Sequence, residues 1–254
     1  MAALVVDAAS YLVSAWCFRR MPSWGVRGGE REPIWPRLWL GFRLNWADPV
    51  LRRVILAAVT LNSGGPIFVT VLPILAYRGL GVSAGALGLA MSAAALGGVT
   101  GAFAAPAVSR RLGLGRTLAY GLLLHNLVGL GILAAPALSP TLVIAVTLGC
   151  YGFFMACINV SSAPIRQLRM SAENQGIMHA AFRTATWGVI PLAALAGGVA
   201  VNLLTPSLGV LDAARLTMVG GTLLAASSFL WGVGLQPLLD RAGTAPAEPV
   251  RAVS

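Results

Sequence analysis

A histidine, an arginine and a tryptophan recur at helical spacing in one apolar stretch of the sequence. His179, Arg183 and Trp187 are four residues apart, so a helix would present all three side chains on one stripe. An ionisable side chain in such a stretch is a candidate functional site, because a charge in hydrocarbon is costly. Arg183 lies about 10 Å along the helix from Gly176. Two interpretations stay open: the guanidinium snorkels to the membrane surface, or it lines a cavity or gate.

Two asparagines in other apolar stretches are candidates for the same cavity. Asn62 precedes the Gly-Gly-Pro sequence of residues 64–66, which predicts a break in a helix. The backbone carbonyls freed by such a break must face protein or a water-filled cavity. Asn159 lies toward the end of another apolar stretch. The candidates for a substrate cavity are therefore Asn62, Asn159, Arg183 and Trp187.

Proton-linked roles fall to a different pair of residues. Asp7 is the only acidic residue well inside an apolar stretch, and it is either a structural helix-cap residue or a proton-linked site. His179 is the second proton-linked candidate. His125 and Asn126 lie in the middle of a further apolar stretch, where we expect packing and an interhelical hydrogen bond.

The sequence has no HExxH, GxSxG or P-loop motif and no paired carboxylates, so we expect no enzyme activity, no metal and no cofactor.

The composition indicates what surrounds these residues. Hydrophobic residues make up 57% of the 254 residues and charged residues only 10%, with a mean hydropathy of +0.79. A soluble domain carries about 25% charged residues, so the chain is expected in the lipid bilayer as a polytopic protein. The net charge of +10 comes from arginines clustered between apolar stretches. This distribution argues against a nucleic-acid partner.

Seven stretches are long enough to cross a bilayer, which takes about 20 mostly apolar residues. They are residues 1–18, 50–77, 82–108, 115–136, 140–164, 176–204 and 212–236. The predicted fold class is an all-α integral membrane protein with about seven transmembrane helices. Between the first two stretches, Trp35, Leu38, Trp39, Phe42 and Trp46 recur at near-helical spacing. That pattern is typical of an amphipathic helix on the membrane surface.

Connections rich in arginine alternate along the chain with connections that hold few or none. Residues 19–53 hold eight arginines, and further ones occur at Arg110, Arg111, Arg116, Arg166, Arg169, Arg241 and Arg251. The alternate connections hold few arginines. The one after residue 77 holds Arg78, the one at residues 136–140 holds none, and Arg215 comes only after the connection between residues 204 and 212. Because short cytoplasmic loops are rich in arginine, residues 19–49 and the tail 239–254 are predicted to be cytoplasmic. The N-terminus and the connection near Arg78 are predicted to lie outside.

Small residues form two patterns within one predicted helix. Gly81, Gly85 and Gly88 share a stripe, and Gly97 and Gly101 form a GxxxG motif. Such patterns allow close approach of helix backbones in lipid. Both are predicted to be packing sites.

Three stretches resemble the major facilitator superfamily, and more narrowly its bacterial drug and siderophore exporters of the enterobactin-exporter-like branch. DAASYLVSAWCFRRM from residue 7 is similar to the sixth helix of that branch. WLGFRLNWADPVLRRVILAAVTLN from residue 39 is similar to the surface helix leading into the seventh. INVSSAPIRQLRMSAENQGIMHAAFRTATWGVIPLAALAGG from residue 158 is similar to the tenth and eleventh helices and the loop between them. The resemblance extends to about residue 238.

The resemblance implies how the chain is organised. Residues 1–18 would be equivalent to helix 6, residues 19–49 a cytoplasmic linker, 50–238 the six-helix C-terminal domain and 239–254 a tail. The first five helices of the family would be absent, through truncation, a misplaced start or a split gene. The family's loop motif would have its weaker copy at Gly101, Arg110, Arg111, Gly113 and Arg116. Ser109 stands where that copy would have an aspartate.

The resemblance also implies a function and partners. The expected function is efflux of a small amphipathic molecule by alternating access in the bacterial plasma membrane. The expected partners are the lipid bilayer, a small-molecule substrate and a missing N-terminal half. The alternative is a truncated or split protein that does not transport unless a separate N-terminal half joins it.

Overall fold

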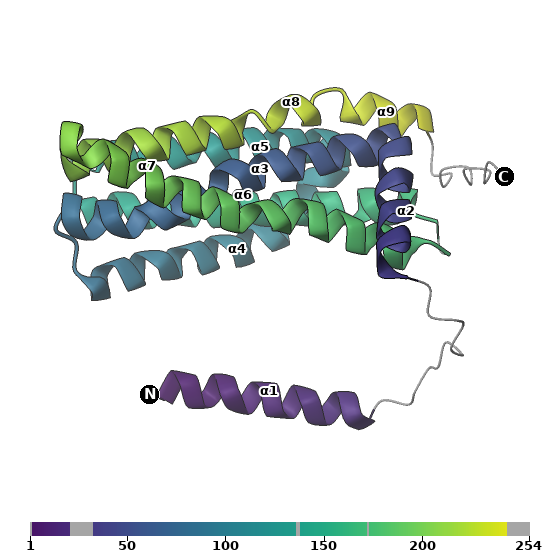
Figure 1. Ribbon diagram of the computed structural model, residues 1–254, viewed down its shortest axis with the longest axis horizontal. Helices are drawn as coiled ribbons and strands as arrows, with labels where there is room; N and C mark the ends of the chain where they lie inside the picture. The colour runs from purple at the N-terminus through teal and green to yellow at the C-terminus, as the bar shows by residue number, and fades with distance from the viewer. Residues whose placement is uncertain (1, 21–32, 136–137, 172, 243–254) are drawn as a thin grey trace. The chain divides into compact units, whose positions relative to one another are not determined.

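The computed structural model describes residues 2–20, 33–135, 138–171 and 173–242. The chain divides into two compact units, residues 1–34 and 35–254. The first unit contains helix α1 (Ala2–Arg20), which is drawn in purple in Figure 1. No strand occurs among the described residues. The prediction of an all-α fold is therefore confirmed.

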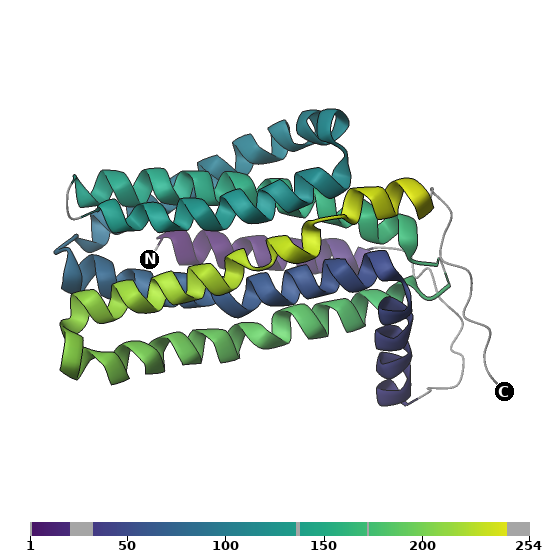
Figure 2. The same ribbon diagram turned by 90° about the horizontal axis from the view of Figure 1, so that it is seen from above.

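The second unit is a bundle of long helices that run back and forth beside one another (Figures 1 and 2). Its elements are α2 (Ile34–Ala47), α3 (Pro49–Ile74) with a π-helical turn (Leu75–Gly79), α4 (Ala84–Leu112), α5 (Leu114–Gly129) with a 3₁₀ turn (Leu130–Ala134), α6 (Pro140–Arg169), α7 (Gln175–Ala226), α8 (Phe229–Gly232) and α9 (Leu235–Ala242). The main helix pairs are α3 with α7, α4 with α6, and α5 with α6.

Helix α7 supplies two passes of the bundle. Its 52 residues would extend about 78 Å if straight, far more than a bilayer core of about 30 Å. The helix turns back at Gly209, where φ is 76° and ψ is 163°. A positive φ favours glycine over residues with a Cβ. The fold-back at Gly209 is visible at the left of Figure 1.

Five stretches of the described residues are long and apolar enough to cross a membrane. They are Pro49–Gly79, Ala84–Leu112, Leu114–Ala134, Pro140–Arg169 and Gln175–Arg241. The last contains both predicted spans 176–204 and 212–236, because α7 passes through Gly209 without an intervening loop. Of the predicted span 1–18, residues 2–18 lie in helix α1, but this helix is not among the five stretches. That it crosses the membrane stays a prediction.

The predicted break after Asn62 is wrong. Helix α3 is continuous from Pro49 to Ile74, with Pro66 inside it. A Cβ on Gly64 would collide with the backbone of Gly221 and Ala225 on the second pass of α7. The glycine therefore permits close helix packing. Pro66 removes a single backbone hydrogen bond, and this packing keeps α3 helical on both sides of it.

Helix α2 runs across the end of the bundle, transverse to the long helices (Figures 1 and 2). The aromatic stripe remains exposed: Trp35, Trp39 and Trp46 are 78%, 72% and 53% accessible. The opposite face docks on α7, where Asn45 Nδ2 donates to the carbonyl oxygen of Met178 at 2.9 Å. An exposed aromatic face on a crosswise helix suits the membrane surface. Its placement there stays a prediction.

The bundle has two ends that differ in charge. The α2 end is where α2, the start of α3, the end of α6, the start of α7 and α9 meet (Figure 1). Of the arginines in the predicted cytoplasmic connections, Arg110, Arg111, Arg166, Arg169 and Arg241 lie at this end of the second unit. The Gly209 end, where α7 turns back, carries Arg78 and, within two turns of Gly209, Arg215. Within the described part of the second unit, the α2 end is thus the richer in arginine.

The packing of α4 on α6 depends on glycine. A Cβ on Gly97 would overlap the carbonyl group of Gly149, and one on Gly101 would overlap that of Phe153. The prediction that this GxxxG motif packs is confirmed. The other stripe behaves differently, because a Cβ on Gly81, Gly85 or Gly88 would meet nothing within 4 Å. Within the described part of the second unit this stripe has no packing neighbour, so its role in packing stays a prediction.

Candidate substrate cavity

A cavity of about 590 Å³ opens between α3, α5, α6 and α7. It has the size of a small-molecule site. All four cavity candidates lie in its wall: Asn62 on α3, Asn159 on α6, and Arg183 and Trp187 on α7. His179 lines it as well. The structure therefore brings Asn62 and Asn159, from two distant parts of the sequence, to the stripe of His179, Arg183 and Trp187 on α7.

Hydrogen bonds fix the polar wall between α3 and α7. Asn62 Nδ2 donates to the carbonyl oxygen of Thr186 at 2.7 Å. The Thr186 hydroxyl donates in turn to the carbonyl oxygen of Phe182 at 2.8 Å. Asn62 and Thr186 both line the cavity. The bond from Asn62 joins α3 to α7 in the cavity wall, and the bond from Thr186 lies within α7.

Two arginines in the cavity wall lie against aromatic rings. The guanidinium carbon of Arg183 is 4.1 Å from the ring centre of Trp187, one turn further along α7. The guanidinium carbon of Arg166, on α6, is 4.2 Å from the ring centre of Phe182 on α7. Stacking on the face of an aromatic ring is a favourable environment for a cation. Arg183 thus points along α7 away from the helix start at Gln175.

A second cavity adjoins the first. It has a volume of about 490 Å³ and lies toward the α2 end, between the last turns of α6 and the first turn of α7. Arg166 and His179 line both cavities. Gln167 and Gln175 are among the other residues of the second wall. The two cavities are therefore neighbours, and the second lies nearer the α2 end.

Prolines free two backbone carbonyls in the cavity wall. A proline within a helix has no N–H to bond the carbonyl four residues earlier. Pro66 in α3 and Pro191 in α7 leave the carbonyls of Asn62 and Trp187 without that donor. Both residues line the main cavity.

Further residues of α6 line the cavity beside the predicted Asn159 and were not predicted from the sequence. They include Met155, Ser162 and Arg166, and together with Asn159 these follow one another at three- or four-residue intervals. This 3.6-residue period is the signal in the sequence that identifies the cavity face of α6. Arg166 was interpreted as a loop residue, whereas it lies in the last turns of α6 and its guanidinium reaches the cavity.

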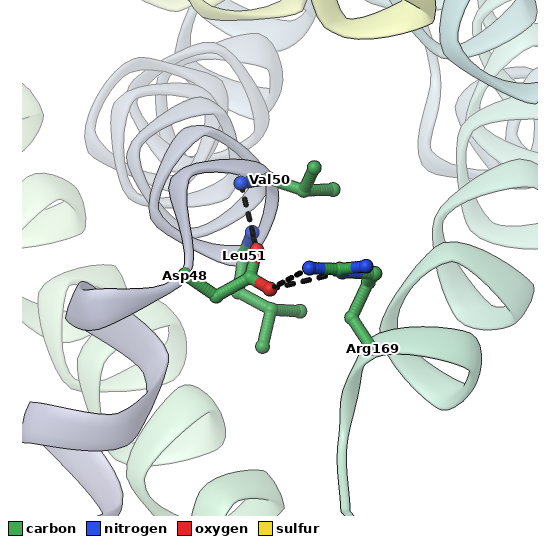
Figure 3. Close-up of polar contacts among 4 residues, drawn as sticks. All are labelled: Asp48, Val50, Leu51 and Arg169. Atoms are coloured by element: carbon green, nitrogen blue, oxygen red, sulfur yellow. Dashed lines mark hydrogen bonds and ion pairs between the residues drawn. The ribbon is translucent and has the colours of Figure 1, made fainter. Parts of the chain in front are cut away.

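A buried ion pair lies at the α2 end (Figure 3). Asp48 Oδ2 accepts hydrogen bonds from Arg169 Nε at 2.9 Å and Nη2 at 2.6 Å. Asp48 Oδ1 accepts from the backbone N–H groups of Val50 and Leu51 and so caps α3. One aspartate thus joins the start of α3 to the end of α6. Neither this helix cap nor the ion pair was predicted from the sequence.

The remaining candidates lie apart from the cavity. Asp7 is exposed on α1 in the first unit, and the Ser10 hydroxyl donates to its backbone carbonyl. Of the predicted loop motif, Gly101 is buried in α4 against α6, while Gly113, with a φ of 86°, separates α4 from α5. Arg110, Arg111 and Arg116 flank Gly113 and are exposed.

The mid-helix pair on α5 fits its expected role in part. His125 Nδ1 lies 3.0 Å from the carbonyl oxygen of Tyr151 on α6, which confirms an interhelical hydrogen bond for the histidine. Asn126 donates to Leu122 of its own helix at 2.7 Å. The histidine therefore supplies the interhelical bond expected of the pair.

A comparison with protein families gives a match to the Major Facilitator Superfamily over residues 2–194. The chain belongs to the major facilitator superfamily. The match runs from α1 into the first pass of α7 and includes all the cavity-lining helices. Members of this superfamily are membrane transporters, so the chain is an integral membrane protein of a transporter family. No curated protein and no solved structure matched it.

Proposed function

We propose that this major facilitator superfamily protein exports a small amphipathic molecule, of the drug or siderophore type, across the bacterial plasma membrane by alternating access. The supporting observation is the cavity that unites Asn62, Asn159, His179, Arg183 and Trp187. Its wall combines hydrogen-bonding groups with large apolar side chains, as a site for an amphipathic ligand requires. The direction of Arg183 toward Trp187 supports a cavity role rather than snorkelling.

The proposed mechanism needs a second six-helix half, on the same polypeptide or another. Alternating access moves two repeats around a site between them. Trp187 is 58% exposed although it lines the cavity, so one side of the site is open in the bundle formed by residues 35–242. The second half would close that side. Without it, we expect binding but no transport.

The proposed orientation places the α2 end and the C-terminus in the cytoplasm. The arginines gathered at that end support it through the positive-inside rule. The aromatic face of α2 would then lie on the cytoplasmic membrane surface. Substrate would enter at the second cavity and move into the main cavity toward Trp187.

Reconstitution into vesicles tests the proposal. The purified chain is incorporated alone or together with the six-helix N-terminal half of an exporter of this superfamily. Uptake of three probes is then followed under an imposed proton gradient: tetraphenylphosphonium, N-phenyl-1-naphthylamine and 8-anilinonaphthalene-1-sulfonate. We expect uptake of at least one probe only with both halves, and its loss in Trp187→Ala. No uptake with both halves present and folded would contradict the proposal.

A further inference from the structure

We infer that the substrate of this cavity is an amphipathic organic anion, with an apolar body and one carboxylate, sulfonate or phosphate group. The inference rests on the proposed transport function, and it adds the charge of the substrate. The charge of the main cavity wall is the first observation. Its lining residues include two arginines, Arg166 and Arg183, and no aspartate or glutamate. The adjoining cavity adds no acid either.

The second observation is that neither arginine has a carboxylate partner among the described residues. The ion pairs there join Arg169 to Asp48 and Arg215 to Asp212. Apart from its ring contact, Arg166 makes only a long 3.4 Å hydrogen bond to the carbonyl oxygen of Ser162. Arg183 makes its contact with the Trp187 ring. The cavity therefore holds two cationic groups whose charge is not neutralised nearby.

Helix α6 offers an internal comparison. Arg166 and Arg169 are three residues apart, and both are partly or wholly buried. Arg169 ties α6 to α3 and has a buried carboxylate on two of its nitrogens. Arg166 faces the cavity and has none. A buried arginine without a carboxylate is unfavourable, so an arginine retained in this state is suited to an anion that arrives with the substrate.

The geometry of the two arginines favours a ligand with paired oxygens. The guanidinium carbon of each arginine lies over a ring, that of Phe182 or that of Trp187. A ring face holds the cation but supplies no carboxylate or carbonyl acceptor, so guanidinium N–H groups remain for a ligand. The planar fork of these N–H groups matches a carboxylate, sulfonate or phosphate in bidentate geometry.

The apolar part of the wall specifies the rest of the ligand. Met155, Leu61 and Ile190 line the same cavity as the arginines. The rings of Phe182 and Trp187 line it as well. A small inorganic anion would leave these side chains facing water. An organic anion with an aromatic or aliphatic body would cover them and gain from the removal of apolar surface from water. The wall therefore fits an amphipathic anion better than a free phosphate or sulfate.

A matched pair of probes tests the sign of the charge. 8-Anilinonaphthalene-1-sulfonate is N-phenyl-1-naphthylamine with one added sulfonate, and tetraphenylphosphonium serves as the cation. Binding to the purified full chain in phosphatidylcholine nanodiscs is measured by equilibrium dialysis, with empty nanodiscs subtracted. We expect the sulfonate to bind about tenfold more tightly than the neutral probe, as charged hydrogen bonds allow. Added salt should weaken only the sulfonate.

Three variants assign the preference to the cavity. Arg166→Gln and Arg183→Gln should each reduce sulfonate affinity about tenfold and leave the neutral probe unchanged. Arg78→Gln removes the same charge at an exposed site outside both cavities and should change neither. Arg183→Lys keeps the charge without the planar fork, so it should retain part of the preference. Circular dichroism melting verifies that each variant is folded.

The outcomes separate this inference from the proposed function. Equal or tighter binding of the neutral or cationic probe, reduced by Trp187→Ala, would overturn the anion and leave the cavity as a transport site. An anion preference that survives both glutamine variants would also overturn it. Failure of all three probes to bind would contradict both proposals. Anion binding with no uptake in the two-half vesicles would contradict transport alone.

Discussion

The two ends of the bundle are built on different principles. At the Gly209 end, an apolar cluster that includes Phe68, Leu75, Ile144 and Met218 is almost fully buried, and none of its members lines either cavity. At the α2 end, seven of the twelve buried residues of the second cluster also line the main cavity. The first cluster lies apart from both cavities, whereas the second cluster is packed around the main one.

The difference extends to polar groups. The α2 end holds the buried Asp48–Arg169 pair and the cavity arginines, whereas the ion pair near the Gly209 end, Asp212–Arg215, is exposed. A closed apolar cluster supplies stability through burial. A cavity wall gives up part of that burial, and the α2 end offsets it with a cap, an ion pair and hydrogen bonds. We expect changes at the Gly209 end to affect stability and changes around the cavity to affect ligand binding.

The largest contrast to test is which side of the membrane each end faces. Single cysteines are placed at Tyr77 near the Gly209 end and at Asp240 in α9, in a background without Cys17, Cys150 and Cys157. An impermeant maleimide applied to intact cells should label position 77 fully and position 240 only after lysis, because the arginine-rich end stays inside. Labelling of position 240 in intact cells would reverse the proposed orientation.

The next contrast is between the two ion pairs. Asp48→Ala should lower the free energy of unfolding by about 3–5 kcal/mol, because it removes one partner of a buried pair and a helix cap. Asp212→Ala is the matched control, since it breaks an exposed pair and should cost less than about 1 kcal/mol. Equilibrium unfolding in mixed detergent micelles measures both. Similar losses for the two variants would show that the α2 end does not depend on its ion pair.

A third contrast separates packing from binding. Leu75 is 1% exposed in the apolar cluster, so Leu75→Ala should cost about 2–5 kcal/mol of stability without changing probe affinity in nanodiscs. Trp187 is 58% exposed in the cavity wall. Trp187→Ala should leave stability within about 1 kcal/mol and weaken binding of every probe. A binding loss in the leucine variant comparable to that in the tryptophan variant would remove the distinction between the two ends.

Several residues of the cavity wall were predicted from the sequence, but the course of α3, one of the helices in that wall, was predicted wrongly. Asn62, Asn159, Arg183 and Trp187 stood out because polar side chains in apolar stretches are costly, and the structure brings them together. The Gly-Gly-Pro sequence was misjudged because local propensity favours a break, while tertiary packing of Gly64 on α7 keeps α3 helical.

Pair contacts set the limit of the sequence prediction. Asp48 and Arg169 are 121 residues apart, and each alone resembles an ordinary loop charge. Gly81, Gly85 and Gly88 recur at helical spacing, as Gly97 and Gly101 do. Within the described bundle, however, only Gly97 and Gly101 of these five meet a neighbouring backbone. A periodic pattern identifies the face of a helix, but which face finds a partner depends on the fold as a whole.

The smallest expected effect compares two glycines of α4, one nearer each end. A Cβ on Gly101 would overlap the carbonyl group of Phe153, so Gly101→Ala must push α4 away from α6. We expect a loss of about 1–3 kcal/mol, as for other overpacked sites. A Cβ on Gly88 would meet nothing within 4 Å, so Gly88→Ala should gain about 0.5–1 kcal/mol from helix propensity alone. The same micelle unfolding assay resolves the opposite signs. A gain in both variants would mean that α4 and α6 are not held in close contact by glycine, and a loss at Gly88 would mean that a further surface packs on that exposed stripe of α4.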